Sequence, residues 1–423
     1  MASTSDPLAL ERGEPINGIE LIRQPSPPGT ASFSATYVAP AGWSYDPSGA
    51  AGAAVLTSAL VTSAAGPYDR VELARLLDRY GATLQHDAAA ESTEVSIWGP
   101  AQEWERLLAI FAEVVMRPRF ENEDLDRVRR QILEHQLREL TQPGHRAERV
   151  LLETLFPKGH PYRESGLGTR RTISRIGRAN VTRFHREHFT SEGALLVVTI
   201  PTSLVRLRPV LQKLFKSFDS SPPRRPSLPP VATAPETRMV AMADRSQVEV
   251  RIGGVSLSRA DPHYLALFLA NEVLGGRPLL SRLFQRVRER HGLAYHASSE
   301  VEAMRWGGYW VARAGTGKDR WKRVIRLMQQ EIRSLSQAPV SASELNRIRE
   351  SAIGEIPLAL ETTSGAHELA VDVAYHHLPD DFYRNWPAQL RALRARDLEE
   401  AARIGLDGSH AISVLAGPLG TSR

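Results

Sequence analysis

The sequence runs through the same order of elements twice, and this repetition constrains the fold more than any other feature. In each half, strands precede a pair of helices, and further strands, a run of helices and an apolar closing strand follow. Asp46–Pro47, typical of a helix start, recurs as Asp261–Pro262, and the closing strand Leu195–Pro201 recurs as Ile412–Pro418. We therefore predict an α+β fold of two homologous halves, each a mostly antiparallel sheet with helices packed on one face.

A proline-rich stretch separates the two halves. Residues 218–238 contain Ser-Ser-Pro-Pro-Arg-Arg-Pro-Ser-Leu-Pro-Pro, which cannot continue a helix or a central strand. A chain of 423 residues is also too long for one ordinary core and fits two domains of roughly 200 residues each. We predict a first domain over 1–217, a stiff linker over 218–238 and a second domain over 239–423.

The composition excludes several classes of function. There is no cysteine, so disulfides, thiolate metal sites and cysteine nucleophiles are excluded. No stretch approaches the ~18 uninterrupted apolar residues of a membrane span, and the first residues lack the basic and apolar regions of a secretory signal, so we expect a cytoplasmic protein. The net charge of +5 is spread over mixed Arg/Glu helix faces without an aromatic-basic module, and we expect no nucleic-acid partner.

The segment from Leu274 to Tyr295 carries the most specific local pattern. Its apolar residues recur at three- and four-residue spacing and predict a helix that Gly292 ends in a left-handed turn. The members of this apolar stripe are Leu279, Leu280, Leu283, Phe284 and Val287. Arg288 falls in the last turn and Tyr295 opens the next strand, so both can return to one side of the loop. Both side chains are donors that could stabilise a developing oxyanion.

Local features alone leave ordinary alternatives open for this segment. An arginine near a helix C-terminus commonly compensates the helix dipole, and a tyrosine at the start of a strand commonly packs. The pair Gly275–Gly276 predicts a loop that either lets a substrate backbone approach closely or simply makes a tight turn.

The order of motifs here resembles a known family. Gly-Gly followed by Ser-Arg-Leu-Phe, Val-Arg-Glu and Gly-Leu-Ala-Tyr resembles the second-half signature of the insulinase/pitrilysin-type zinc peptidases, which include the mitochondrial processing peptidase and the core subunits of the cytochrome bc1 complex. The resemblance covers almost the whole chain and implies a clamshell of two halves. It also implies that Arg288 and Tyr295 contact substrate near the scissile bond and that Gly275 and Gly276 line the substrate channel.

The same resemblance implies that a peptide substrate adds as a strand to a sheet edge near residues 85–89, which makes Gln85 and Ala88 substrate-binding candidates.

The zinc motif of the family is missing. In catalytic members the first-half helix carries His-x-x-Glu-His, in which two histidines bind zinc and the glutamate is the general base. Alignment on Gly52 places Val55, Ser58 and Ala59 at these positions, and His-x-x-Glu-His occurs nowhere in the 423 residues. Glu134 is the nearest match to the third ligand, and one carboxylate alone would hold zinc weakly. We therefore expect no metal or other cofactor in this chain.

Other candidate sites are weaker. His185 and His188 lie three residues apart and could face one way on a helix, whereas His376 and His377 are adjacent and point to different sides. No Gly-x-Ser-x-Gly elbow supports a serine hydrolase, and the Gly-Thr-Gly-Lys at residues 315–318 lacks the spacing of a phosphate loop.

The family includes two-chain enzymes in which one subunit holds zinc and the other supplies the arginine–tyrosine pair. We predict that this chain is such a zinc-free subunit, inactive alone, whose partner is a zinc-bearing His-x-x-Glu-His subunit of the same family and whose substrate is a peptide. The alternatives are an interaction protein without a catalytic role, similar to the respiratory core subunits, and a stand-alone hydrolase with an unrecognised site.

Overall fold

The computed structural model describes residues 6–218, 226, 228–231 and 234–419. Of the predicted linker, 218–238, residues 219–225, 227, 232 and 233 lie outside the described residues. At its ends, Phe218 is buried and a strand already begins at Glu236.

Two compact units divide the chain, and each is assembled from three stretches of sequence. The first unit comprises Met1–Gln136, Ser165–Ser227 and Ile356–Arg384, and the second comprises Leu137–Glu164, Leu228–Glu355 and Asn385–Arg423. Each unit thus contains one segment from the opposite half of the sequence. These boundaries differ from the continuous domains 1–217 and 239–423 expected from the linker. The reason is that one helix of each half packs its apolar face against the sheet of the other half.

The first unit is built on a six-stranded sheet with the order β1-β2-β6-β3-β5-β4. The strands are β1 (Glu11–Ile16), β2 (Ile19–Pro25), β3 (Ser32–Ala39), β4 (Thr83–Ala88), β5 (Thr93–Pro100) and β6 (Leu195–Ile200). Neighbours pair antiparallel except β2 and β6, which are parallel. The closing strand therefore lies in the middle of the sheet, and β4 lies at an edge.

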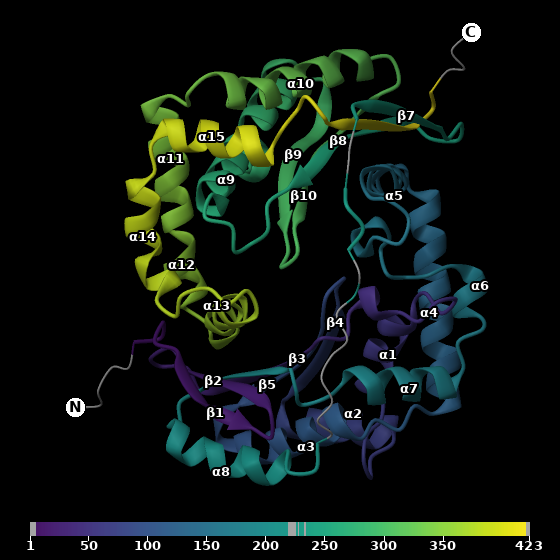
Figure 1. The fold of residues 1–423 in the computed structure, drawn as a ribbon, viewed down its shortest axis with the longest axis vertical. Helices are drawn as coiled ribbons and strands as arrows, with labels where there is room; N and C mark the ends of the chain where they lie inside the picture. The colour runs from purple at the N-terminus through teal and green to yellow at the C-terminus, as the bar shows by residue number, and fades with distance from the viewer. Residues whose placement is uncertain (1–5, 219–225, 227, 232–233, 420–423) are drawn as a thin grey trace. The chain divides into compact units, whose positions relative to one another are not determined.

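Helices cover both faces of this sheet. One face packs on α1 (Ala53–Val61), α3 (Trp104–Met116) and α7 (Arg178–His188), which share its large core with Tyr37, Leu196 and Val198. The alternate residues Val38, Leu195 and Val197 point to the other face, where they pack on α13 (Thr363–Tyr375). Figure 1 shows α13 and α3 on opposite sides of the strands. The α+β class is confirmed, but the expectation of helices on one face only is wrong.

The second unit repeats this plan with a five-stranded sheet of order β7-β11-β8-β10-β9. The strands are β7 (Glu236–Ala241), β8 (Gln247–Ser256), β9 (Ala294–Ala303), β10 (Gly308–Gly317) and β11 (Ile412–Gly417). Only β7 and β11 pair in parallel, and β9 lies at an edge. The helices α9 (Tyr264–Asn271), α10 (Trp321–Gln337) and α15 (Ala395–Gly405) pack on this unit, and α5 (Pro143–Leu155) packs on β8 and β11.

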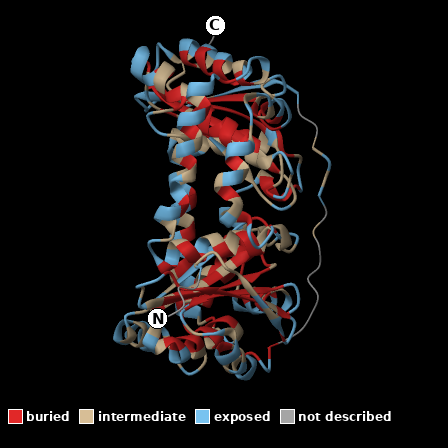
Figure 2. Cartoon of the chain, turned by 90° about the vertical axis from the view of Figure 1, so that its left-hand side faces the viewer, coloured by how far each residue is buried: buried red, intermediate tan, exposed pale blue. Residues whose placement is uncertain are grey.

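Helices α5 and α13, which we call the transferred helices, are equivalent. Each has 13 residues, and each packs on the sheet formed by the opposite half of the sequence. The internal repeat seen in the sequence therefore extends to this reciprocal exchange. Among the described residues, the remaining α-helices of six or more residues are α2 (Arg70–Tyr80), α4 (Asn122–Thr141), α8 (Leu204–Leu214), α11 (Ala342–Ile353) and α14 (Phe382–Ala392). Figure 2 shows the buried residues concentrated on the strands and on the helix faces against them.

The predicted helix start at Asp46–Pro47 is displaced but retains its cap. Helix α1 begins only at Ala53, yet the Asp46 carboxylate accepts hydrogen bonds from the backbone N of Gly52 at 2.6 Å and of Ala54 at 2.8 Å. The aspartate thus satisfies free N–H groups of the first turn across an intervening loop. Within the described ranges, no helix combines the length and apolar character needed to cross a membrane.

Candidate functional site

The segment that carries Arg288 and Tyr295 belongs to the second unit and departs from a regular α-helix. The residues Glu272–Gly276 and Phe284–Arg290 form two π-helical turns, a conformation that is frequent at functional sites. Leu283, Phe284 and Val287 are buried as the apolar stripe predicts. Leu279 is not part of that stripe, because it lies in the preceding turn with φ 63 and its side chain is exposed.

Gly275 and Gly276 lie in the first π-helical turn rather than in a loop. A Cβ at Gly275 would lie 2.3 Å from the backbone N of Ser299 in β9, and one at Gly276 would lie 2.2 Å from Glu272 Oε1. Gly275 therefore allows this turn to pack directly on β9, and Gly276 leaves room for the Glu272 carboxylate. Their predicted contact with substrate stays a prediction.

Arg288 and Tyr295 lie together on an exposed surface. The Arg288 guanidinium carbon is 4.8 Å from the centroid of the Phe284 ring and 5.7 Å from that of Tyr295, within the range of cation–π contacts. The Arg288 side chain is 44% exposed and Tyr295 is 77% exposed. No hydrogen bond to another described residue engages either side chain. Both donors are therefore available to an external acceptor, in the proximity that the sequence predicted.

The three positions that would form a zinc site lie on α1 in the first unit and do not fit a metal. Val55 and Ala59 are partly buried against the core, and Ser58 is fully buried with its Oγ 3.2 Å from His86 Nδ1 in β4. Glu134 is exposed on α4. Among the residues that the structure describes, no group of three or more His, Asp or Glu side chains could hold a metal ion.

The contact between His86 and Ser58 was not predicted from the sequence, because it joins a strand to a helix and leaves no local pattern. Burial lowers the pKa of His86 despite the opposing effect of Asp87. The imidazole is therefore neutral at neutral pH, but a single histidine with a serine hydroxyl supplies one good metal ligand rather than the three of a zinc site.

Gln85 and Ala88 both lie in the edge strand β4. They pair with Ser96 and Thr93 of β5, and β4 has no second neighbour in the sheet. An edge strand presents a row of unpaired backbone groups to which an extended peptide can add. The position of these residues agrees with the predicted strand addition, which itself stays a prediction.

A cavity of about 650 Å³ lies in the first unit between the sheet and α13. His367 of α13 is buried at its base, with Nε2 2.7 Å from Thr36 Oγ1 and Nδ1 2.8 Å from Thr199 Oγ1. Burial lowers the pKa of His367 to about 3, so the ring is neutral. Glu94 also lines the cavity, and burial together with the nearby Asp87 raises the pKa of Glu94 to about 7.

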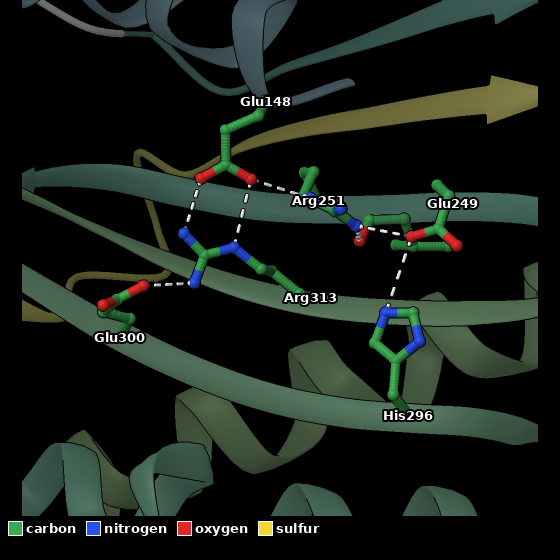
Figure 3. A network of polar contacts seen from close by, with 7 residues as sticks. Glu148, Glu249, Arg251, His296, Glu300 and Arg313 are labelled. Carbon is green, nitrogen blue, oxygen red and sulfur yellow. Dashed lines mark hydrogen bonds and ion pairs between the residues drawn. The ribbon is translucent and has the colours of Figure 1, made fainter. Parts of the chain in front are cut away.

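A cavity of about 660 Å³ lies in the second unit against α5, and a network of charges borders it (Figure 3). Glu148 of α5 accepts two hydrogen bonds from Arg313, at 2.6 and 3.1 Å, and one from Arg251 at 2.9 Å. Arg251 also donates to Glu249, and Arg313 donates to Glu300 at 2.5 Å. Burial alone would raise the pKa of Glu148, but the two arginines outweigh it and lower the pKa.

The histidine pair of α7 serves packing. His185 Nε2 lies 2.8 Å from the backbone O of Val115, and burial lowers the pKa of His185 to about 4. His188 contacts the rings of Phe184 and Tyr45. These two histidines therefore do not converge on a common ligand.

Comparisons with known proteins agree with this geometry. Residues 22–165 match a family model described as insulinase (peptidase family M16), and residues 175–352 match one described as peptidase M16 inactive domain. A protein of Mycobacterium bovis named an uncharacterized zinc protease is 26% identical over 384 residues, which are 88% of this chain and 85% of that protein. A Helicobacter pylori protein named a non-peptidase homolog is 20% identical over 332 residues, 78% of this chain and 76% of that protein.

The fold itself is shared with solved structures. The crystal structure of the peptidase M16 inactive domain from Pseudomonas fluorescens superposes with a TM-score of 0.91 at 21% sequence identity, and the match covers 98% of this chain and 99% of that one. The two family models together span most of the chain, and the repeated halves have the family's fold. The chain therefore belongs to the insulinase family of peptidases, family M16, as a member that lacks the family's His-x-x-Glu-His zinc motif.

Proposed function

We propose that this chain is the zinc-free subunit of a two-chain zinc metallopeptidase and contributes Arg288 and Tyr295 to the active site of its partner. The observation that carries the proposal is the contrast within the chain. The exposed guanidinium and phenol lie together and are free of hydrogen bonds to described residues, whereas Val55, Ser58 and Ala59 occupy the metal positions. The partner would hold the zinc on a His-x-x-Glu-His helix.

In this proposal the two donors act on the reacting carbonyl of a peptide. The Arg288 guanidinium donates to the carbonyl oxygen, which gains negative charge in the tetrahedral intermediate, and the Tyr295 hydroxyl donates a second hydrogen bond. Loss of one such donor typically costs about 2.7–4 kcal/mol of transition-state stabilisation. The edge of β4, with Gln85 and Ala88, offers the backbone groups that hold a peptide in an extended form.

A peptide-cleavage assay on the co-purified complex tests the proposal. We expect the Arg288→Ala and Tyr295→Phe forms each to lower kcat by roughly two orders of magnitude without dissociating the complex. Arg290→Ala is the matched control, because Arg290 is an exposed arginine of the same turn. Unchanged rates in both variants, or full activity of the zinc-bearing partner alone, would show that this chain has no catalytic role.

The second candidate is an interaction protein of the same fold with no part in catalysis. The specific observation in its favour is the relative from Helicobacter pylori that is named a non-peptidase homolog. For this function, the complex would form normally but cleavage would not depend on Arg288 or Tyr295. A stand-alone hydrolase is the third reading, and peptide cleavage by the purified single chain would support it.

We propose that the chain is located in the cytoplasm, because its sequence contains no cysteine. Cell fractionation with an antibody against the chain would test this location.

A further inference from the structure

Tyr295 lies at a bulge of one residue in the edge strand β9. The pairing of β10 with β9 is regular as far as Gly315, which pairs with His296. The next residue of β10, Thr316, pairs with Ala294, so Tyr295 has no partner in the register. β-Bulges are frequent next to active sites, where they change the direction of a side chain.

Regular pairing would place this tyrosine beside buried residues. Thr316 pairs with Val248 of β8 on one side and with Ala294 on the other. Thr316 is 2% exposed and Val248 is fully buried. Without the bulge, Tyr295 would take the place of Ala294 beside this buried pair, whereas with the bulge its side chain is 77% exposed. The bulge therefore keeps the phenol at the surface.

The equivalent strand of the first unit has no such irregularity. The sheet orders β2-β6-β3-β5-β4 and β7-β11-β8-β10-β9 correspond strand by strand, so β4 is the counterpart of β9. β4 pairs with β5 without a shift from Thr83 to Ala88. The repeated fold therefore does not require a bulge at this edge, and the bulge occurs in the strand that carries the phenol.

Side chains from β10 and the start of α10 hold the turn that leads into the bulge. The Thr316 hydroxyl donates to the backbone O of Leu293 at 2.5 Å, and both residues are buried. The Arg320 guanidinium donates to the backbone O of Gly292 at 3.1 Å, and Gly292 is left-handed with φ 56. Two consecutive carbonyl groups shortly before Tyr295 are therefore bound from outside the turn.

Arg288 has a comparable irregularity on its own side of the turn. Phe284–Arg290 is π-helical, a conformation in which the hydrogen bonds span five residues instead of four. The Arg288 guanidinium carbon lies 5.7 Å from the centroid of the Tyr295 ring. Each donor thus lies on an irregular element, and the bond from Thr316 fixes the segment between them.

We propose that Thr316 is a positioning residue of the proposed active site, because its hydroxyl bond to Leu293 holds the bulge that presents Tyr295 beside Arg288. Thr316 acts through the tyrosine and not on the substrate. Since the bond is buried, replacing the threonine removes a hydrogen bond for which water does not readily substitute. The inference rests on the proposed function, in which the Tyr295 hydroxyl donates to the reacting carbonyl.

Steady-state peptide cleavage by the co-purified complex tests this role. Thr316→Val removes the hydroxyl at nearly constant volume, and we expect kcat to fall about tenfold while KM changes less than about twofold. Thr316→Ala removes the hydroxyl with a smaller side chain and should lower kcat similarly. Thr316→Ser keeps the hydroxyl and should retain kcat within about twofold of the original chain.

A matched control lies on α5 of the same unit. The Thr154 hydroxyl donates to the backbone O of Val150 at 2.6 Å, far from Tyr295 in the sequence. Thr154→Val removes the same kind of bond and should leave kcat unchanged. Circular dichroism of each purified variant shows that it is folded before the rates are compared.

A double variant separates positioning from a general loss of structure. Tyr295→Phe already lacks the hydroxyl through which Thr316 is proposed to act. Thr316→Val should therefore lower kcat no further in the Tyr295→Phe background, because two residues that act as a unit have non-additive effects.

The outcomes distinguish this inference from the proposed function. Unchanged kcat in Thr316→Val and Thr316→Ala, together with a low kcat in Tyr295→Phe, would overturn the inference and leave the proposed function intact. A further loss of kcat in the double variant would also overturn it, because Thr316 would then act on the structure as a whole. Full activity of Tyr295→Phe would contradict the proposed role of Tyr295 itself, and with it any positioning role of Thr316.

Discussion

The two transferred helices, α13 and α5, contact equivalent faces of their sheets through side chains of different chemistry. In the first unit, α13 meets the polar face of its sheet through the neutral ring of His367, hydrogen-bonded to Thr36 and Thr199. In the second unit, α5 meets the equivalent face through Glu148, which is bound to Arg251 and Arg313. The backbone repeat is therefore preserved, while the side chains that hold it together have changed from hydrogen-bonded neutral groups to an ion network.

This difference decides what each cavity can bind. A network in which carboxylates and guanidinium groups already neutralise one another leaves little free charge, because each ion has partners that compensate for its lost hydration. In the first unit the cavity is lined by four acidic residues and three histidines, and none of its described lining residues is arginine or lysine. The comparison thus separates a paired ion network from an acidic cavity without arginine or lysine within one chain.

The largest effect on stability is expected in the ion network. Glu148→Ala should lower the free energy of unfolding by about 3–5 kcal/mol, because it leaves the buried Arg251 and the half-buried Arg313 without their shared partner. Urea unfolding followed by circular dichroism measures the change. Glu153→Gln, which removes the half-exposed i,i+4 pair with Arg149 on the same helix, is the control and should cost less than about 0.5 kcal/mol. A loss of similar size in both variants would contradict the network's structural role.

A smaller effect is expected in the first unit. His367→Ala should cost about 2–3 kcal/mol, since it leaves a cavity and deprives the hydroxyls of Thr36 and Thr199 of a partner. The same unfolding measurement applies, with His263→Ala as the exposed control. If His367→Ala proves more damaging than Glu148→Ala, neutral hydrogen bonds hold the helix more strongly than the ion network does, and the comparison reverses.

The pH dependence of stability sharpens the contrast further. The folded pKa of His367, about 3, lies below its ordinary value of 6.5, so between these limits the unfolded chain binds a proton that the folded chain does not. Stability therefore rises with pH across this window and is lost on acidification, with a slope of up to roughly 1.4 kcal/mol per pH unit.

Replacement of this histidine isolates its contribution. His367→Asn should flatten the slope between pH 4 and 6. Glu94 opposes the trend, because its raised pKa of about 7 makes the folded chain bind the extra proton. Chemical unfolding at several pH values measures these slopes, and an unchanged slope in His367→Asn would show that another group dominates the acid response.

For part of the candidate site, the sequence predicted which residues lie close together. Local spacing predicted that Arg288 and Tyr295 lie on one surface, as they do, and the absent motif at Val55, Ser58 and Ala59 led us to expect no metal in this chain, which stays a prediction. Both conclusions depend on contacts within a short segment or on residue identity alone. The expected Gly275–Gly276 loop is instead a π-helical turn in which Gly275 packs on Ser299 of β9, a contact between segments that no local pattern records.

What the sequence by itself determined is the repeat, the α+β class and the family, since periodic apolar residues and motif order are local properties of the chain. Only the tertiary structure decided that α5 and α13 are exchanged between the units, and hence that Glu148 meets Arg313 while His367 meets Thr36. The physical reason is that a helix buries its apolar face on whichever sheet completes a core. That choice depends on contacts across more than a hundred residues, which no local pattern records.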